Sequence, residues 1–575
     1  MASENKYQVV ICGGGLAGLT LSLQLRKLFP KAAVTVIEKI TRPLPEAAHK
    51  VGESTVEIGG HYFSEVLDLK TYLQEKQFPK LGLRYFYGDA SQPFDQRAEL
   101  GPSMFSPVPT FQLDRGTLEN DLREMAITAG VNLIEGASLK EIEIIEGGLN
   151  RVSYSFNELE QTIDANWVVD AMGRRRYIQT KLGLKKESPH SASSVWFRYE
   201  GKVTVDDLVP KSNLDWHQRN VEDRYYSTNH LMGLGYWVWL IPLASGNTSV
   251  GIVTQNDLHD FAAYSRSYET SFEWIRSHEP RLAEYLENKQ PLDFRKIKNY
   301  SYGSEQLFSG NGWSCVGEAG IFSDPFYSPG SDMIAITNTF TCNLIEADLN
   351  GELNTDKVNL LNDFILKTVF PDQLSYYVGG YHTFGNTQIA STKFLWDTLY
   401  YWRVYAHAFM NGVYSDLNHL QQFESYVKQF SELNRALQLD FKKWAETKPS
   451  QEHFAYADLA RKGAFIESAI MLTTRPNKNN YHQHWEEQLS FLRDMRNAIV
   501  QHNSKGKMNN DFAPFTAFYG KLPAVSQLKN RINGQIARIS NGAFLYSVRN
   551  LYIRFFVRGK ERVRLAWLLR VLYAR

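Results

Sequence analysis

The chain has 575 residues, of which 43% are hydrophobic and 22% charged, as in ordinary globular enzymes. Its formal net charge of +1 at pH 7 gives no global field that would draw it to nucleic acid. The three cysteines are scattered (Cys12, Cys315 and Cys342), which argues against a disulfide framework and against a zinc or other metal site. We find no charged-then-apolar leader and no apolar run of about 18 residues, so we expect a cytoplasmic protein.

Residues 7–12 form an apolar predicted strand that runs into the glycine pattern Gly13-x-Gly15-x-x-Gly18. A predicted helix follows, and the next predicted strand ends on Glu38. In this context the glycines permit a tight turn, a close approach to pyrophosphate and close packing of the helix, while Glu38 can accept hydrogen bonds from a ribose. The helix N-terminus offers unpaired N–H groups to phosphate. The segment therefore predicts a dinucleotide site; the alternative is a chance glycine-rich turn.

Four further short motifs follow in chain order. They are Gly52-Glu53-Ser54-Thr55, Gln112-Leu113-Asp114-Arg115, Asp170-Ala171-Met172-Gly173-Arg174 and the segment from Gly317 to Asp324-Pro325. The second precedes a predicted helix, and the third ends an apolar predicted strand. Any one of them is compatible with an ordinary turn, but four in this order are hard to obtain by chance.

The segment from residue 190 to 300 alternates as in an antiparallel sheet. Within it lies the string Trp237-Val238-Trp239-Leu240-Ile241-Pro242. Two rigid indoles at alternate positions of a strand fall on one face, where they would form a wall. The alternative is that both are ordinary core or surface aromatics.

Together these motifs resemble the flavin-dependent halogenases, closer to the phenol and pyrrole branch than to the tryptophan halogenases, within the superfamily of FAD-dependent aromatic hydroxylases. The resemblance covers roughly residues 5–345. It implies an α/β fold with an FAD-binding Rossmann-like domain, an antiparallel-sheet substrate domain and a C-terminal helical domain. The expected division is 1–190 and 300–350 for the FAD-binding domain, 191–299 for the sheet and 351–575 for the helices.

The resemblance implies FAD as the cofactor. The residues that it assigns to FAD are Gly13, Gly15, Gly18, Glu38, Ser54, Gln112, Arg115, Asp170, Gly317 and Asp324. Asp324 is expected at the ribityl chain, and the helix after Gly330 is expected to direct its N-terminus at the flavin ring. Glu318 stands where the family usually has Asp. We find no second nucleotide fingerprint, so reduced FAD is expected from a separate flavin reductase.

For catalysis, the resemblance implies that Trp237 and Trp239 keep the organic substrate away from the flavin. It also implies that Lys80 is the family's essential lysine, which holds hypohalous acid by a hydrogen bond or becomes a haloamine. Either role needs an amine at a partly dry site. Lys70 and Lys76 are nearby competitors, and a solvated surface charge is the alternative for any single lysine.

The segment after Asp324 sets the expected substrate and halide. Tyr327 stands where tryptophan halogenases have Glu, which favours a phenolic or pyrrolic substrate and adds Tyr327 to the expected catalytic set. Ser328 and Gly330 are the expected halide ligands, for chloride or bromide. Pro329 replaces the family's common Ser or Thr and has no N–H, so one donor is missing from this turn.

The sequence therefore predicts an FAD-dependent halogenase that acts on an electron-rich, phenolic ring, free or on a carrier protein, through flavin hydroperoxide and hypohalous acid. One alternative is an FAD-dependent monooxygenase, either hydroxylase or epoxidase, on the same scaffold with halide binding lost. Another is a flavin-bound interaction protein of a biosynthetic complex. His61 and His230 are candidate general bases, but lone histidines are more often structural.

The C-terminal part has helical periodicity, clearest over 334–349 and 423–444. Residues 531–575 hold ten Lys or Arg and a single acid, Glu561, interleaved with apolar and aromatic residues. This composition is typical of an interfacial helix or of a surface that docks an acidic carrier. It would allow peripheral contact with the inner membrane; the alternative is a helix packed on its own domain.

Overall fold

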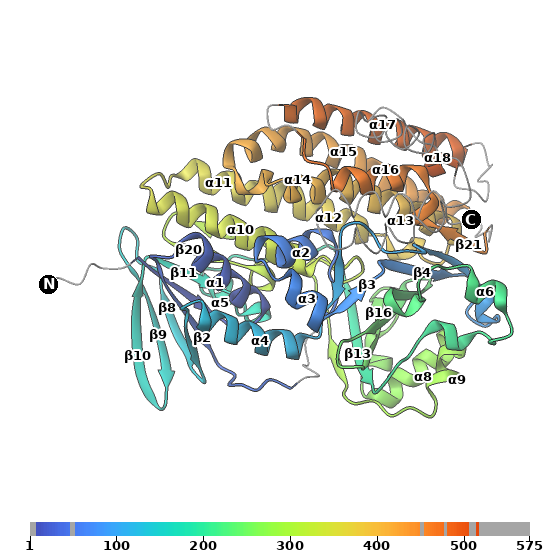
Figure 1. Ribbon diagram of the computed structural model, residues 1–575, viewed down its shortest axis with the longest axis horizontal. Coiled ribbons are helices and arrows are strands. Elements are labelled where there is room, and N and C mark those ends of the chain that lie inside the picture. Colours follow the sequence, from blue (N-terminus) through green and yellow to red (C-terminus); the bar gives the residue numbers. More distant parts are fainter. Residues whose placement is uncertain (1–6, 46–51, 449–453, 477–479, 505–512, 517–575) are drawn as a thin grey trace, which may run out of the picture.

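The computed structural model describes residues 7–45, 52–448, 454–476, 480–504 and 513–516 (Figure 1). The basic segment 531–575 lies outside these residues, so its predicted contact with a membrane or an acidic carrier lies outside them too. Figure 1 shows the C-terminal helices as one layer, lying across two separate sheets. In the described part, no helix is both long and apolar enough to cross a membrane.

The first sheet has six strands in the order β19-β20-β11-β1-β2-β7. Their bounds are β1 (Gln8–Cys12), β2 (Ala33–Glu38), β7 (Asn132–Glu135), β11 (Trp167–Asp170), β19 (Phe308–Ser309) and β20 (Trp313–Cys315). All pairs are parallel except β19 with β20. The central strands are buried and almost wholly apolar, as expected when helices cover both faces of a parallel sheet. The predicted strands at both ends of the glycine pattern are confirmed, and the α/β class with them.

Three helices and a small ribbon surround this sheet. The helices are α1 (Leu16–Leu28), α4 (Arg115–Thr128) and α10 (Gly330–Leu349); α1 and α4 pack together, and α10 packs on α1. The strands β8 (Ser138–Glu143), β9 (Asn150–Phe156) and β10 (Leu159–Ala165) form an antiparallel ribbon that projects at the left of Figure 1. The smaller pairs are β3 (Phe78–Lys80) with β6 (Thr110–Gln112) and β12 (Lys185–Glu187) with β18 (Tyr302–Ser304).

The second sheet has eight strands in the order β17-β13-β16-β15-β14-β4-β5-β21. Their bounds are β4 (Leu83–Tyr87), β5 (Ala98–Gly101), β13 (Ala192–Tyr199), β14 (Thr228–Gly233), β15 (Tyr236–Pro242), β16 (Thr248–Gln255), β17 (Arg295–Ile297) and β21 (Tyr456–Asp458). The pairs are antiparallel except β14 with β4 and β21 with β5. The sheet predicted within 191–299 thus also contains strands from 83–101 and 456–458. These strands lie outside the expected bounds of the sheet domain, and the domain boundaries remain a prediction.

Helices cover both faces of the second sheet. One face holds its own apolar core with α8 (Tyr268–His278) and α9 (Pro280–Leu286), together with the short α6 (Leu214–Gln218) and α7 (Phe261–Tyr264). The other face belongs to the main core, which is shared with the C-terminal helices. Trp237 and Trp239 of β15 lie on this inner face.

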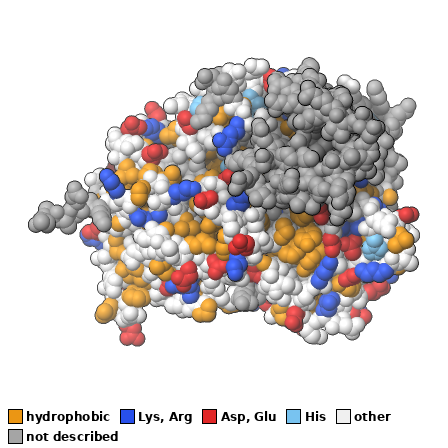
Figure 2. Space-filling view, viewed as in Figure 1, with side chains coloured by type: hydrophobic (Ala, Val, Ile, Leu, Met, Phe, Trp, Pro, Cys, Tyr) orange, Lys and Arg blue, Asp and Glu red, His pale blue; other side chains and the backbone are white. Residues whose placement is uncertain are grey.

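The C-terminal layer is helical, as its periodicity predicts. Its helices are α11 (Thr355–Asp363), α12 (Phe370–Tyr377), α13 (Thr387–Tyr401), α14 (His407–Met410), α15 (Leu417–Thr447), α16 (Gly463–Leu472), α17 (Tyr481–Ser504) and α18 (Ala513–Thr516). The helices predicted over 334–349 and 423–444 are confirmed within α10 and α15. The middle of α13 is buried on every side although it carries two charges, Lys393 and Asp397. Where the described surface is visible in Figure 2, charges of both signs are interspersed.

Candidate active site

The turn between β1 and α1 is built on glycine. Gly13 has φ +113° and donates its N–H to Ile37 O at 2.8 Å. A Cβ on Gly18 would lie 2.0 Å from Gly13 O, so only glycine lets α1 approach the turn this closely. The Glu38 carboxylate closes the turn by accepting from the N–H of Gly14 at 2.6 Å. The predicted fingerprint therefore has the geometry that its spacing implies, and it leaves the N-terminus of α1 open toward a phosphate.

A cavity of about 760 Å³ lies between this nucleotide sheet and the second sheet, which we call the Trp cavity. It is lined by Leu16, Gly52, Glu53, Ser54, Arg115, Thr228, His230, Trp237, Trp239, Ile241, Glu318, Phe322, Pro325, Ser328, Gly330, Ser331 and Ile334. Ser331 Oγ is buried there without a hydrogen-bond partner among the described residues. The α10 N-terminus adds unpaired N–H groups and a favourable dipole. The aromatic lining, the unpartnered Ser331 hydroxyl and the helix N-terminus fit a flavin ring.

The two tryptophans lie side by side on one face of β15 and line the Trp cavity. Their ring centroids are 5.6 Å apart. Trp237 Nε1 donates to Tyr381 OH at 2.8 Å, and Trp239 Nε1 donates to Ser249 Oγ at 3.1 Å. Both rings are thus fixed by packing and by a hydrogen bond, as a wall requires.

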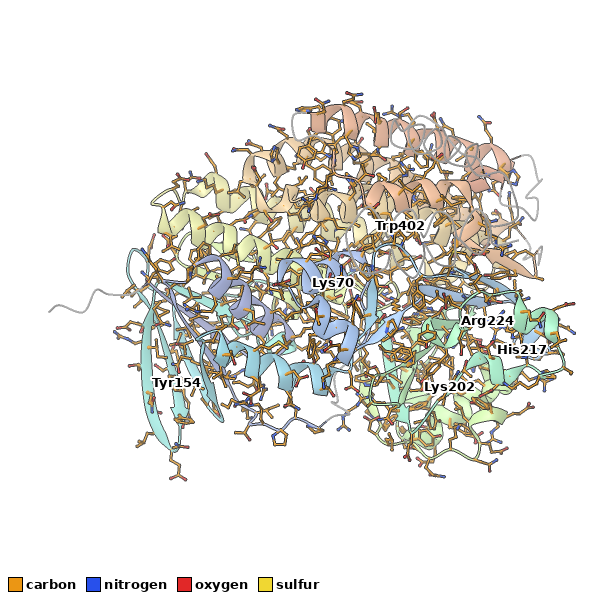
Figure 3. All side chains as sticks on the ribbon, viewed as in Figure 1. Lys70, Tyr154, Lys202, His217, Arg224 and Trp402 are labelled. Carbon is orange, nitrogen blue, oxygen red and sulfur yellow. The ribbon has the colours of Figure 1, made fainter. Side chains whose placement is uncertain are left out.

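A second cavity of about 1160 Å³ lies under the C-terminal helices, and we call it the Lys cavity. The lining includes Val56, Glu57, Lys80, Leu81, Leu83, Met104, Tyr327, Pro329, Asp332, Gln373, Tyr376, Tyr377, Phe394, Asp397, Tyr401, Trp402, Tyr405, Phe465 and Ile466. Figure 3 labels Trp402, which lies in the helical layer where that layer meets the strands. Eight of the lining residues are aromatic, so the cavity suits a flat aromatic ligand.

The turn before α10 separates the two cavities. Ser328, Gly330 and Ser331 line the Trp cavity, whereas Tyr327 and Pro329 line the Lys cavity. Successive residues of one short segment therefore face opposite sides of a thin wall.

Lys80 stands at this wall, at the end of β3. Its side chain is almost fully buried, and Nζ donates to Ser54 Oγ at 2.8 Å and to Thr55 O at 2.7 Å. Burial lowers the pKa of Lys80 to about 7, against the opposing effect of the Glu57 and Asp332 carboxylates. Ser54 belongs to the Trp cavity, so this amine joins the two cavities. The competitors Lys70 (Figure 3) and Lys76 are exposed and line neither cavity.

Two carboxylates beside Lys80 carry no sequence signal and were missed. Asp332, in the first turn of α10, accepts from Gly59 N at 2.8 Å and from Tyr401 OH at 2.6 Å. Burial raises the pKa of Asp332 to about 7, and it also raises the pKa of Glu57. The three ionisable groups share one low-dielectric site, so protons can redistribute among them near neutral pH.

Comparison with known proteins shows which proteins this chain resembles. A model of the "FAD binding domain" family matches residues 6–243. Flavin-dependent halogenase chlA of Dictyostelium discoideum is 27% identical over 381 residues, which is 61% of this chain and 62% of that protein. The 1H-pyrrole-2-carbonyl-(peptidyl-carrier protein) chlorinase of Pseudomonas fluorescens is 28% identical over 376 residues, 61% of this chain and 78% of that protein. Over 61% of its length, the chain is thus similar in sequence to flavin-dependent halogenases.

Solved structures of halogenases share the fold. The halogenase PltM, whose structures include a complex with phloroglucinol and FAD, superposes with a TM-score of 0.65 at 17% identity over 84% of this chain and 97% of that one. The flavin-dependent brominase Bmp2 superposes with a TM-score of 0.54 at 20% identity over 74% of this chain and all of that one. FAD is therefore the cofactor that the N-terminal domain binds.

Asp324 differs from its expected setting. It is fully buried, and its Oδ2 accepts from His190 Nε2 at 2.6 Å, from Tyr300 OH at 2.6 Å and from Tyr381 OH at 2.8 Å. Its Oδ1 accepts from Phe326 N at 2.7 Å. Both oxygens are engaged by protein donors, and Asp324 does not line the Trp cavity. Its contact with the ribityl chain remains a prediction.

Some of the other predicted flavin ligands line the Trp cavity, whereas others lie behind it or shape nearby turns. Ser54 and Arg115 line the Trp cavity. Gln112 lies behind it and donates to Thr228 Oγ1 at 2.9 Å. Asp170 accepts from the N–H groups that follow β11, at 2.9 and 3.0 Å, and burial raises its pKa to about 6. Gly317, with φ +54°, forms the turn after β20.

Two further predictions concern His230 and the halide turn. Burial lowers the pKa of His230 to about 3, so the ring is neutral and unsuited to act as a base near pH 7.

Ser328 has φ +57°, and its N–H donates to Pro325 O at 2.9 Å. Pro329 has no N–H, so Gly330 is the first residue of this turn with a backbone donor at a helix N-terminus. The halide roles of Ser328 and Gly330 remain predictions.

Proposed function

We propose that this chain is an FAD-dependent halogenase that installs chloride or bromide on a phenolic ring. The position of Lys80 is the observation that carries this proposal. A nearly dry amine with a pKa near neutrality lies at the wall between the Trp cavity and the Lys cavity. Such an arrangement suits a small reactive molecule that is made on one side and used on the other.

The glycine turn, Glu38, Arg115 and the N-terminus of α10 would hold FAD. Bound reduced FAD supplies the oxygen chemistry that converts halide to hypohalous acid. We propose that a separate reductase delivers the reduced form. Trp237 and Trp239, each fixed by a hydrogen bond, exclude the larger aromatic substrate from the flavin side.

Lys80 holds and orients hypohalous acid at the wall. Two of its N–H groups are already engaged by Ser54 Oγ and Thr55 O, so the ammonium form has one N–H left for the oxygen of hypohalous acid. When that oxygen leaves as the halogen is transferred, the same proton can follow it to form water. A group that exchanges its proton near pH 7 suits this cycle.

The Lys cavity favours a neutral, hydroxylated aromatic substrate. Among the described residues, its lining contains Glu57, Asp332 and Asp397 but no arginine, so none of these lining residues pairs a substrate carboxylate in bidentate fashion. We propose a phenol, free or presented by a carrier protein.

A second candidate, flavin-dependent hydroxylation, is favoured by the turn before α10. The Ser328 N–H is engaged by Pro325 O and Pro329 has none, which leaves fewer backbone donors for a halide. In that case oxygen, not halogen, would be transferred to the ring.

One assay separates the two. The protein is given reduced FAD, oxygen and bromide with a panel of phenols, and the products are examined by mass spectrometry for the bromine isotope pair. Halogenation predicts brominated product that disappears when bromide is omitted. Oxygenated product that forms without any halide would replace the proposal with the hydroxylase.

A further inference from the structure

A second buried ion pair lies in the Lys cavity, on the C-terminal helix α13. Lys393 and Asp397 are one helical turn apart, both nearly inaccessible, and they form a salt bridge. Charges on a helix that is buried on all sides are costly unless they serve a purpose. Asp397 also lines the cavity, so the pair is not merely packed inside the layer.

Three donors orient the Asp397 carboxylate. Oδ2 accepts from Lys393 Nζ and from Tyr327 OH, the latter at 2.7 Å, and Oδ1 accepts from Gln438 Nε2 at 2.6 Å. A carboxylate oxygen has two acceptor sites, so Oδ1 can take one more hydrogen bond. The free site belongs to a carboxylate that lines the Lys cavity.

Two further polar groups of the same cavity point to a ligand. Tyr376 OH and Gln373 Oε1 are buried, belong to lining residues, and find no hydrogen-bond partner in the described part of the chain. An orphaned buried polar group costs about 1–3 kcal/mol, so such groups are usually satisfied by water or by ligand. A hydroxylated aromatic ring could satisfy them.

We propose that Asp397 is the general base that accepts the proton of the substrate's phenolic hydroxyl as the carbon–halogen bond forms. The inference rests on the proposed halogenase function and adds a residue and a substrate requirement to it. Tyr327 and Lys393 act as positioning residues that hold the carboxylate in place by a hydrogen bond and a salt bridge.

The step balances with hypohalous acid as the only oxidant. The ring carbon attacks the halogen, the oxygen–halogen bond breaks, and the hydroxyl proton moves to Asp397. The ring then carries a carbonyl and an sp³ carbon that bears both halogen and hydrogen. The leaving oxygen takes a proton from the Lys80 ammonium to form water, the ring proton then restores that ammonium, and Asp397 returns its proton to the substrate oxygen. Halogenation makes the hydroxyl strongly acidic, so a carboxylate is a strong enough base.

The test compares a phenol with its O-methyl ether, which has no proton to give. Asp397→Asn is expected to slow bromination of the phenol about a hundredfold or more, and to leave the slow bromination of the ether unchanged. Since Asp397→Asn strands the Lys393 charge, the double variant Asp397→Asn with Lys393→Met is measured as well, with bound FAD and the melting temperature as folding controls.

If bromination of the phenol slows in either folded variant while bromination of the ether does not, the proposal is supported. Equal loss on phenol and ether, or no loss on either, overturns the role of Asp397 and leaves the halogenase function standing. Absence of brominated product from the wild-type protein with either substrate overturns both.

Discussion

Lys80 Nζ and Ser54 Oγ are 2.8 Å apart across the wall between the two cavities of this protein. Ser54 lines the Trp cavity and Lys80 lines the Lys cavity. The hydrogen bond therefore links the flavin side of the site to the substrate side. It also fixes Lys80, which is buried, whereas Lys70 and Lys76 are exposed. The chemistry that we propose depends on this link.

The first prediction concerns Lys80 itself. Lys80→Ala should lower the yield of halogenated product at least about a hundredfold, because the group that holds hypohalous acid is gone. FAD should stay bound, and hypohalous acid should still escape to solution, where a β-diketone traps it. Lys76→Ala, at an exposed position that lines neither cavity, is the matched control. Retained halogenation in Lys80→Ala would remove the assigned role.

The second prediction concerns pH and stability. The pKa of Lys80 is about 7 in the folded state, against an ordinary 10.5 in the unfolded chain. Below pH 7 both states hold the proton, so pH has no effect through this group. Between pH 7 and 10.5 only the unfolded state holds it. The free energy of unfolding should therefore rise with pH, relative to Lys80→Met, by up to about 1.4 kcal/mol per pH unit.

This difference is measured by urea unfolding of wild type and Lys80→Met at several values of pH from about 6 to 9. Subtracting the variant's free energy of unfolding from that of wild type removes the contribution of groups that titrate alike in both proteins. The two neighbouring carboxylates, Glu57 and Asp332, are tracked by repeating the series in Asp332→Asn. A difference that stays flat across this range would show that Lys80 keeps its proton in the folded state.

The third prediction concerns the tryptophan wall. Trp239 pairs with Gly251 of the neighbouring strand, where a Cβ would lie 2.1 Å from the indole Cζ2. Gly251→Ala should displace the indole, cost about 1–3 kcal/mol of unfolding free energy and weaken FAD binding. Gly310→Ala is the control, since open space surrounds Gly310. Equal stability of the two variants in urea would mean that the wall yields easily.

The fourth prediction concerns the halide turn. Ser328 holds φ +57°, a conformation that glycine adopts freely and a β-branched residue resists. Ser328→Gly should preserve the KM for bromide, whereas Ser328→Val should raise it severalfold by distorting the turn. Bromide saturation curves at a fixed phenol concentration measure this. Identical curves for all three proteins would place halide binding elsewhere.

The sequence determined much of the flavin side. The glycine pattern, its flanking strands and Glu38 are local, since a turn, its helix and the next strand are set by neighbours in the chain. The period-two spacing of Trp237 and Trp239 likewise decides that they share a face. Lys80 was distinguishable from Lys70 and Lys76 only by its surrounding motif, and its burial became visible only in the fold.

The tertiary structure alone decided the substrate side. Asp332 and Glu57 meet Lys80 only after α10 and α2 (Glu57–His61) pack together, and Asp397 meets Tyr327 only when α13 lies over the turn before α10. Tyr327 and Asp397 are 70 positions apart, and no local pattern encodes such a distance. Burial then sets their pKa values, because desolvation depends on the whole surrounding core and not on the residue or its sequence neighbours.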